Sequence, residues 1–332
     1  MNYYFAPMDG ITDYLYRKVV WKHFPYADKL YAPFIQPNDK PVIVPKEYNE
    51  ICPENNKGIP MVPQILTRDA MGFIRVGEIL EDMGYDEINL NLGCPAKLIV
   101  SKGKGAGMLA DLDSLDEFLD TIFSHNWVAK ITVKTRLGLT DNADFASLLE
   151  VYGKYPIHEL TIHPRFRSDF YSGDPRLDEF SKVSSIMDLT SIHEDNSIKH
   201  SYSLHNSQDI KICYNGNINS VADRDAILGQ FPYISSIMCG RGALSNPALF
   251  RELKGGAKMS KQEFIDFHKD IYHTYGNTMV KEKHFLHKMQ EMWTYWNQYF
   301  NFDMELLKKL RGVSSLEEYT PAVNSLLDSI LI

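Results

Sequence analysis

The sequence predicts an α/β protein, built as a (β/α)8 TIM barrel and followed by an all-α helical domain. Short apolar runs alternate with longer segments of helical period, the pattern of a parallel sheet with helical crossovers. The chain of 332 residues is also too long for one modest core. We therefore expect a barrel over residues 1–250 and a helical part over residues 257–332.

Eight short apolar runs fit the strands of such a barrel. The expected strands cover residues 3–6, 30–35, 60–66, 87–92, 130–135, 159–163, 210–214 and 235–239. Helices are expected between them, at 12–24, 68–83, 114–124, 145–154 and 220–228. Since the reactive residues of a (β/α)8 barrel lie at the carboxyl ends of its strands, candidate site residues are sought there.

One strand end receives two asparagines and a cysteine. Apolar residues alternate with Asn89 and Asn91, as in a strand, and Gly93 and Pro95 end the run. Cys94 lies in this turn, and the segment after it reads as a flexible, cationic loop whose lysines would stabilise negative charge. We therefore expect Cys94 to be reactive. The alternative is a small buried hydrophobic residue.

Each of the eight expected strands ends at a polar or charged residue, or at a proline or glycine. These residues are Pro7 with Met8, Gln36, Gln64, Asn91 with Cys94, Lys134 with Arg136, His163 with Arg165, Asn215, and Gly240 with Arg241. A single Lys or His at a strand end is more often solvated than catalytic. Eight such ends in one register are better explained by a shared site.

The last two strand ends are rich in glycine. Gly216 lies between Asn215 and Asn217, and Gly240 precedes Arg241. In barrels of this kind the loops after strands seven and eight commonly bind phosphate through backbone N–H groups. Arg241 would add a bidentate contact. The pattern favours a phosphate site over two ordinary glycine turns.

Lys134 lies between apolar residues on a strand of the barrel wall. A buried ammonium without a partner is costly, so this side chain requires an anionic or electron-rich ligand. A flavin ring, which becomes anionic on reduction, meets that requirement. A Schiff-base lysine is the competing chemistry.

Beyond residue 257 the apolar period becomes helical. Ser260 and Glu263 have the spacing of a capping box, and further helices are expected at 279–300, 304–311 and 315–331. Aromatic residues in the first of these alternate with cationic or titratable ones, which are Lys281, Lys283, His284, His287 and Lys288. This face either meets RNA phosphates or exposes its lysines to water beside an aromatic core.

Composition limits the remaining classes. A net charge of −8 argues against indiscriminate nucleic-acid binding but permits a local basic face. No apolar run has the length of a membrane span, and the N-terminus lacks a signal-peptide pattern. The four cysteines show neither paired nor metal-like spacing. We expect a cytoplasmic monomer without a metal, and a surface insertion at 186–209.

Taken in order along the chain, these motifs resemble the tRNA-dihydrouridine synthase family. The resemblance rests on Ala6-Pro7-Met8, Asn91-Leu92-Gly93-Cys94-Pro95, Gly105-Ala106, Val133-Lys134-Thr135-Arg136, His163-Pro164-Arg165, Asn215-Gly216 and Gly240-Arg241-Gly242-Ala243. It covers the whole barrel and, more loosely, the helical tail.

The resemblance implies an FMN-bound barrel and a helical domain that helps to grip tRNA. It assigns FMN binding to Pro7, Met8, Gln64, Lys134, His163, Asn215, Gly216, Asn217, Gly240 and Arg241. A hydride would pass from the reduced flavin to uracil C6, Cys94 would protonate C5 as general acid, and NADPH would reduce the flavin again. The residues expected at the substrate are Asn91, Arg136, Arg165, Lys283 and His284.

Three departures from the family pattern qualify what the resemblance implies, and one of them is the segment 186–209, which is longer than usual. Asn217 stands where members usually carry Asp, so that contact loses a charge. The tail matches weakly, so the choice of uridine does not transfer. Two other functions remain open at this point: an FMN oxidoreductase acting on a free pyrimidine or other small molecule, and a flavin-free RNA-binding barrel. Cys94, Lys134 and His163 together argue against the last.

Overall fold

The computed structural model describes residues 1–38, 43–184 and 210–330. Within them, nine parallel strands form one sheet in the order β3-β2-β1-β9-β8-β7-β6-β5-β4. The strands are β1 (Asn2–Phe5), β2 (Lys29–Tyr31), β3 (Met61–Val62), β4 (Gln64–Ile65), β5 (Glu87–Leu92), β6 (Lys130–Arg136), β7 (Glu159–His163), β8 (Lys211–Tyr214) and β9 (Ser236–Cys239). The expected insertion at 186–209 lies outside the described residues.

The sheet closes into a barrel where β3 is followed directly by β4. Strands β3 and β4 are the two halves of one expected strand, separated by Pro63, which has no N–H to donate. β3 pairs with β2, and β4 pairs with β5, so the two edges of the sheet are joined covalently. The Pro63 carbonyl still accepts a hydrogen bond from Asn89 N at 3.0 Å. The predicted eight-position barrel is confirmed, and the ninth strand is this interruption.

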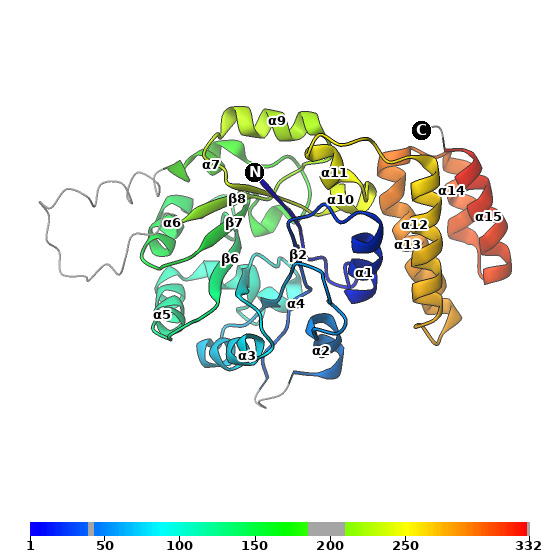
Figure 1. Ribbon diagram of the computed structural model, residues 1–332. Coiled ribbons are helices and arrows are strands. Elements are labelled where there is room, and N and C mark those ends of the chain that lie inside the picture. The colour runs from blue at the N-terminus through cyan, green and yellow to red at the C-terminus, as the bar shows by residue number, and fades with distance from the viewer. Residues whose placement is uncertain (39–42, 185–209, 331–332) are drawn as a thin grey trace, which may run out of the picture.

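Helices surround the barrel on its outer side (Figure 1). They are α1 (Tyr14–His23), α2 (Pro45–Ile51), α3 (Ala70–Asp82), α4 (Lys97–Val100), α5 (Leu112–Phe123), α6 (Phe145–Gly153), α7 (Leu177–Ser181), α9 (Val221–Gln230), α10 (Arg241–Ser245) and α11 (Leu249–Leu253). The five predicted helices correspond to α1, α3, α5, α6 and α9, with ends that differ by at most two residues. The short helices lack enough turns to show a period in the sequence.

Side-chain caps explain several of these boundaries. Asp13, Asp111, Asp144 and Ser220 each precede a helix and accept a hydrogen bond from an N–H of its first turn. The segment after Cys94 corrects an expectation, because it is not a flexible loop. It forms α4 and the 3-10 helix η1 (Gly105–Ala110).

The tail is a helical bundle beside the barrel (Figure 1). It comprises α12 (Lys261–Gly276), α13 (Glu282–Phe300), α14 (Met304–Gly312) and α15 (Leu316–Asp328). The predicted capping box of Ser260 and Glu263 is confirmed. The ring of Phe264 meets Trp293 and Trp296 edge-on, with centroids 5.9 and 5.2 Å apart. The aromatic residues of α13 therefore form the core of the bundle, as one of the two sequence interpretations required.

The bundle packs against the barrel through α12 on α1 and α13 on α10. Phe267 of α12 meets Tyr16 and Phe24 at centroid distances of 6.2 and 5.6 Å. Apolar residues of barrel and tail belong to one continuous core. The division at residues 250 and 257 into two domains stays a prediction.

A buried ion network lies at the amino-terminal end of the strands. Lys29 Nζ is 2.5 Å from Glu87 and 3.6 Å from Glu159, and each of these residues begins its strand. Tyr31 donates a hydrogen bond to Glu87 at 3.0 Å, and Tyr4 donates one to Glu159 at 3.2 Å. Burial raises the pKa of Glu159, and Lys29 opposes that shift. In (β/α)8 barrels this end serves stability rather than catalysis.

The Lys29 network yields a stability prediction. Lys29→Met should lower the free energy of unfolding by roughly 2 to 3 kcal/mol, because it leaves two buried carboxylates without their cation. Lys254→Met is the matched control, since Lys254 pairs with Asp28 at 2.7 Å on the surface and should lose less than about 1 kcal/mol. Urea unfolding measures both, and equal losses would contradict the assignment.

Candidate active site

The Cys94 turn is held from two sides. Asn91 Oδ1 accepts hydrogen bonds from the backbone N–H groups of Gly93 and Cys94, at 3.0 and 2.9 Å. Arg136 Nε donates to the Gly93 carbonyl at 2.9 Å. Asn91 Nδ2 in turn donates to Gln64 Oε1 at 2.7 Å. The position of the thiol is therefore fixed by neighbouring strands, and Asn91 has a structural role there besides its expected contact with substrate.

Glycine at position 105 permits η1 to pack against this turn. Gly105 has a φ of 56°, and a Cβ there would lie 2.9 Å from the Cys94 carbonyl oxygen. Ala106 N donates to the same oxygen at 3.1 Å. Cys94 is half-buried, whereas the other three cysteines are buried. It is thus the accessible thiol of the protein.

The environment keeps this thiol protonated. Burial raises the pKa of Cys94; the backbone N–H of Ala96 lowers it, and Asp9 raises it. Arg136 and Lys134 lower it further, but the net direction is upward. A neutral thiol at physiological pH is a proton donor rather than a nucleophile.

Lys134 lies on β6 in register with Asn91 of β5 and Thr161 of β7. Within the described part of the chain, its ammonium has no hydrogen-bond or ion-pair partner. Burial and the nearby Arg136 lower the pKa of Lys134 to about 8. An amine in this state binds an electron-rich or anionic group favourably, since such a group offsets its lost hydration.

His163 is neutral in this environment. Burial, followed by the charges of Arg136 and Lys134, holds the pKa of His163 well below its usual value. Arg165 Nη1 lies 2.9 Å from His163 Nε2. Because a guanidinium only donates, Nε2 is the acceptor and Nδ1 carries the proton. His163 therefore offers an N–H donor without adding a positive charge.

The loops after β8 and β9 are joined by polar contacts. Asn217 Oδ1 accepts from Arg165 Nη2 at 3.2 Å and from Arg241 Nη2 at 3.1 Å. Asn215 Nδ2 donates to the Met238 carbonyl at 2.8 Å. These loops therefore hold two guanidinium groups on one neutral amide oxygen, which leaves their charge available to an anion.

Two glycines shape the same region. A Cβ on Gly216 would lie 2.0 Å from the Tyr214 hydroxyl oxygen, so no other residue fits there without rearrangement. A Cβ on Gly240 would lie 3.5 Å from Met8 Sδ. Met8 and Gly240, which are expected to bind a cofactor after β1 and β9, are thus neighbours.

Tyr171 is a site residue that the sequence analysis missed. Its ring stacks on His163 with centroids 6.2 Å apart, and the guanidinium carbons of Arg136 and Arg241 lie 5.2 and 5.8 Å from it. Tyr171 is nevertheless 55% exposed. The preceding Phe170 has a φ of 51°, rare for a non-glycine residue. Its sequence signal was weak, because Phe166 and Phe170 are also aromatic residues in the segment after the His163 strand.

The structure thus brings most of the expected site residues together and leaves two apart. Lys283 and His284 are exposed in the first turn of α13, and among the described residues neither side chain forms a hydrogen bond or ion pair with the barrel. Lys288 corrects both interpretations of that helix, since it is buried and faces the barrel. It is therefore available neither to water nor to RNA phosphates.

A model of the dihydrouridine synthase (Dus) family matches residues 4–330. The chain belongs to this family. It is 27% identical over 252 residues to tRNA-dihydrouridine synthase B of Pasteurella multocida, covering 76% of this chain and 68% of that protein. It is 24% identical over 330 residues to tRNA-dihydrouridine(16) synthase of Vibrio vulnificus, covering 96% and 95%. Family membership makes the protein an oxidoreductase.

Solved structures support the fold of this Dus family member. A complex of 2-naphthoyl-CoA reductase aligns with a TM-score of 0.53 at 9% identity, over 77% of this chain and 50% of the other. A single-residue mutant of morphinone reductase, in complex with tetrahydroNAD, aligns with a TM-score of 0.50 at 9% identity, over 79% and 90%. At such identities the likeness concerns the barrel fold alone.

None of the helices in the described ranges is long and apolar enough to cross a bilayer. Among the same residues, no group of three or more His, Cys, Asp or Glu side chains is arranged to hold a metal ion.

The environment of Cys94 predicts its reactivity. In the folded protein, iodoacetamide should modify Cys94 before Cys52, Cys213 or Cys239, because only Cys94 is accessible. The rate should rise with pH around a midpoint above that of free cysteine, since burial raises the pKa. Mass spectrometry of peptides gives the rate at each site. A midpoint below that of free cysteine would contradict a proton-donor thiol.

Proposed function

We propose that this protein reduces uridine in tRNA to 5,6-dihydrouridine, with FMN as its cofactor and NADPH as reductant. Family membership supports the reaction, and the names of its relatives support tRNA as substrate. The observation that carries the proposal is the combination of a protonated Cys94 thiol, in the turn after β5, with an unpartnered Lys134 ammonium on the adjacent strand β6. The Cys94 thiol can act as a proton donor, and the Lys134 ammonium can bind an electron-rich ring.

The residues present fit FMN. Lys134 lacks an acceptor of its own among the described residues, and His163 offers a neutral N–H donor beside it. Arg241, whose guanidinium meets only a neutral amide oxygen of Asn217, would supply cationic charge to a phosphate, and the turn of Gly216 and Asn217 would offer its backbone N–H groups. We assign FMN contacts also to Pro7, Met8, Gln64, Asn215 and Gly240, which lie at or near the carboxyl ends of the predicted strands.

The chain's own groups account for the proton side of the reaction. Bound FMN supplies the hydride chemistry at uracil C6. Cys94 holds its proton at Sγ and delivers it to C5, so that one hydride and one proton saturate the C5–C6 bond. The resulting thiolate recovers a proton from water. Asn91 and Arg136 keep the Gly93–Cys94 turn in place throughout.

Recognition of tRNA would use exposed groups around the mouth of the barrel, which is the end formed by the carboxyl ends of the strands. The half-exposed ring of Tyr171 offers a stacking face for a base, since any nucleobase presents a π-surface. Lys283 and His284 offer charge to phosphates from the tail. Since the reacting uridine must leave its stack to reach Cys94, contacts outside the mouth would offset the cost of unstacking. The cytoplasmic location and monomeric state stay predictions.

Replacement of Cys94 tests the proton donor. Cys94→Ala should bind FMN as the parent does but form dihydrouridine in unmodified tRNA about 10² to 10⁴ times more slowly, because a positioned general acid contributes about that factor. Cys52→Ala is the matched control and should retain full activity. Liquid chromatography of the nucleosides measures the product. Full activity of Cys94→Ala, or equal turnover of free uridine, would contradict the proposal.

The pKa of Lys134 predicts the pH dependence of FMN affinity. The ammonium favours the ligand, and the pKa of Lys134 is lowered to about 8, so the FMN dissociation constant should rise as pH increases through about 8. Lys134→Met should bind more weakly and lose this dependence. Lys130→Met, at the exposed start of the same strand, is the control and should keep it. Flavin fluorescence titration decides between these outcomes.

A further inference from the structure

Lys288 of the tail donates hydrogen bonds into the barrel. Its Nζ lies 2.5 Å from the Gly10 carbonyl oxygen and 3.4 Å from that of Ile11, and the side chain is only 7% exposed. Both carbonyls belong to the loop that follows β1. That loop also contains Pro7 and Met8, the first residues along the chain that are assigned to the cofactor. A tail helix therefore contacts the mouth of the barrel directly.

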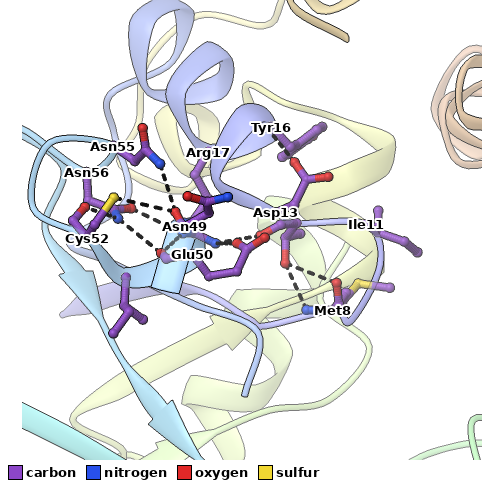
Figure 2. A network of polar contacts seen from close by, with 12 residues as sticks. Met8, Ile11, Asp13, Tyr16, Arg17, Asn49, Glu50, Cys52, Asn55 and Asn56 are labelled. Atoms are coloured by element: carbon purple, nitrogen blue, oxygen red, sulfur yellow. Dashed lines mark hydrogen bonds and ion pairs between the residues drawn. The ribbon is translucent and has the colours of Figure 1, made fainter. Parts of the chain in front are cut away.

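Residues of the barrel hold this loop as well (Figure 2). Met8 N donates to Thr12 Oγ1 at 2.8 Å, and Arg17 Nη1 donates to the Thr12 carbonyl at 2.8 Å. Arg17 is fully buried and pairs with Glu50 of α2 at 3.0 Å. The end of the loop near Thr12 is thus fixed by α1 and α2. Its Gly10–Ile11 part receives side-chain donors from Lys288 instead.

A second tail residue reaches the same place. Tyr275 of α12 donates to Asp13 Oδ1 at 2.6 Å, and that oxygen also accepts from Tyr16 N to cap α1. Lys288 Nζ lies 3.8 Å from Asp13 Oδ2 and 5.3 Å from the centroid of the Tyr275 ring. Two tail helices therefore meet on the carboxylate at the end of this loop.

Stability alone is a poor reason for this arrangement. Taking an ammonium out of water is costly, and a well-packed apolar side chain of similar length is often as stable as a buried ion pair or more so. Directed hydrogen bonds to two carbonyls do something that an apolar side chain cannot, because they set the position of the loop. That position matters where Met8 Sδ stands beside Gly240.

We propose that Lys288 is a positioning residue for the cofactor: it holds the Gly10–Ile11 backbone so that Met8 keeps its place at the flavin. The tail is then part of the FMN pocket as well as a surface for RNA. This inference rests on the proposed function, since it requires FMN in the mouth of the barrel.

The test compares full-length variants as apoproteins titrated with FMN, with affinity measured by quenching of flavin fluorescence. Lys288→Met should raise the FMN dissociation constant about tenfold, because hydrogen bonds from a charged group to the loop are lost. Lys288→Arg should restore most of the affinity, since a guanidinium can donate to both carbonyls. Lys283→Met, exposed on the same helix, should bind FMN as the parent does.

Thermal unfolding of each apoprotein separates positioning from general stability. The proposal expects Lys288→Met to lose FMN affinity without a matching loss of unfolding temperature. It is overturned if Lys288→Met binds FMN like the parent, or if Lys288→Arg fails to restore affinity while both variants are equally destabilised. Should Lys288→Met not fold, Tyr275→Phe gives the decision by the same criterion. A parent protein that takes up no FMN would instead refute the proposed function.

Discussion

Four cationic side chains crowd the mouth of the barrel, and none of them forms an ion pair within the described residues: Lys134, Arg136, Arg165 and Arg241. Backbone carbonyls and one amide oxygen accept from the guanidinium groups, as Gly93 does from Arg136 and Asn217 does from Arg165 and Arg241. These neutral acceptors satisfy the donors without cancelling the charge. Burial, and after it this crowding of cations, lowers the pKa of both His163 and Lys134.

The two ends of the barrel treat buried charge in opposite ways. At the amino-terminal end, Lys29 lies between Glu87 and Glu159, so its charge is compensated within the protein. At the carboxyl end, the three guanidinium groups have hydrogen bonds and the Lys134 ammonium has none, and within the described residues none of the four cations has an ion-pair partner. Ion pairs between buried charges hold the strands together at the amino-terminal end. Buried cations without an ion-pair partner at the carboxyl end favour the binding of an anionic ligand. The same fold thereby separates the function of stability from that of binding.

The helical tail joins the second of these ends. Phe267 and the aromatic core of α12 and α13 attach the bundle to α1 by apolar contact. Lys288 and Tyr275 add directed polar contacts to the loop after β1, at Gly10, Ile11 and Asp13. Apolar packing attaches the helical tail to the barrel, and the hydrogen bonds set the position of the loop after β1. The tail and the loop after β1 are therefore joined by both apolar packing and hydrogen bonds.

The sequence by itself determined the barrel, its main helices and the strand ends that carry the site. Strand period, caps and turns are local properties, and a closed parallel barrel brings all strand ends to one face, so Cys94 and Lys134 could be predicted as neighbours. The tertiary structure alone decided the rest. Tyr171 belongs to the site because its ring contacts cations from other segments of the chain. Lys288 is buried because it donates to the carbonyl of Gly10, which is 278 residues away. A long side chain turns toward whichever partners the fold supplies, and local sequence does not contain them.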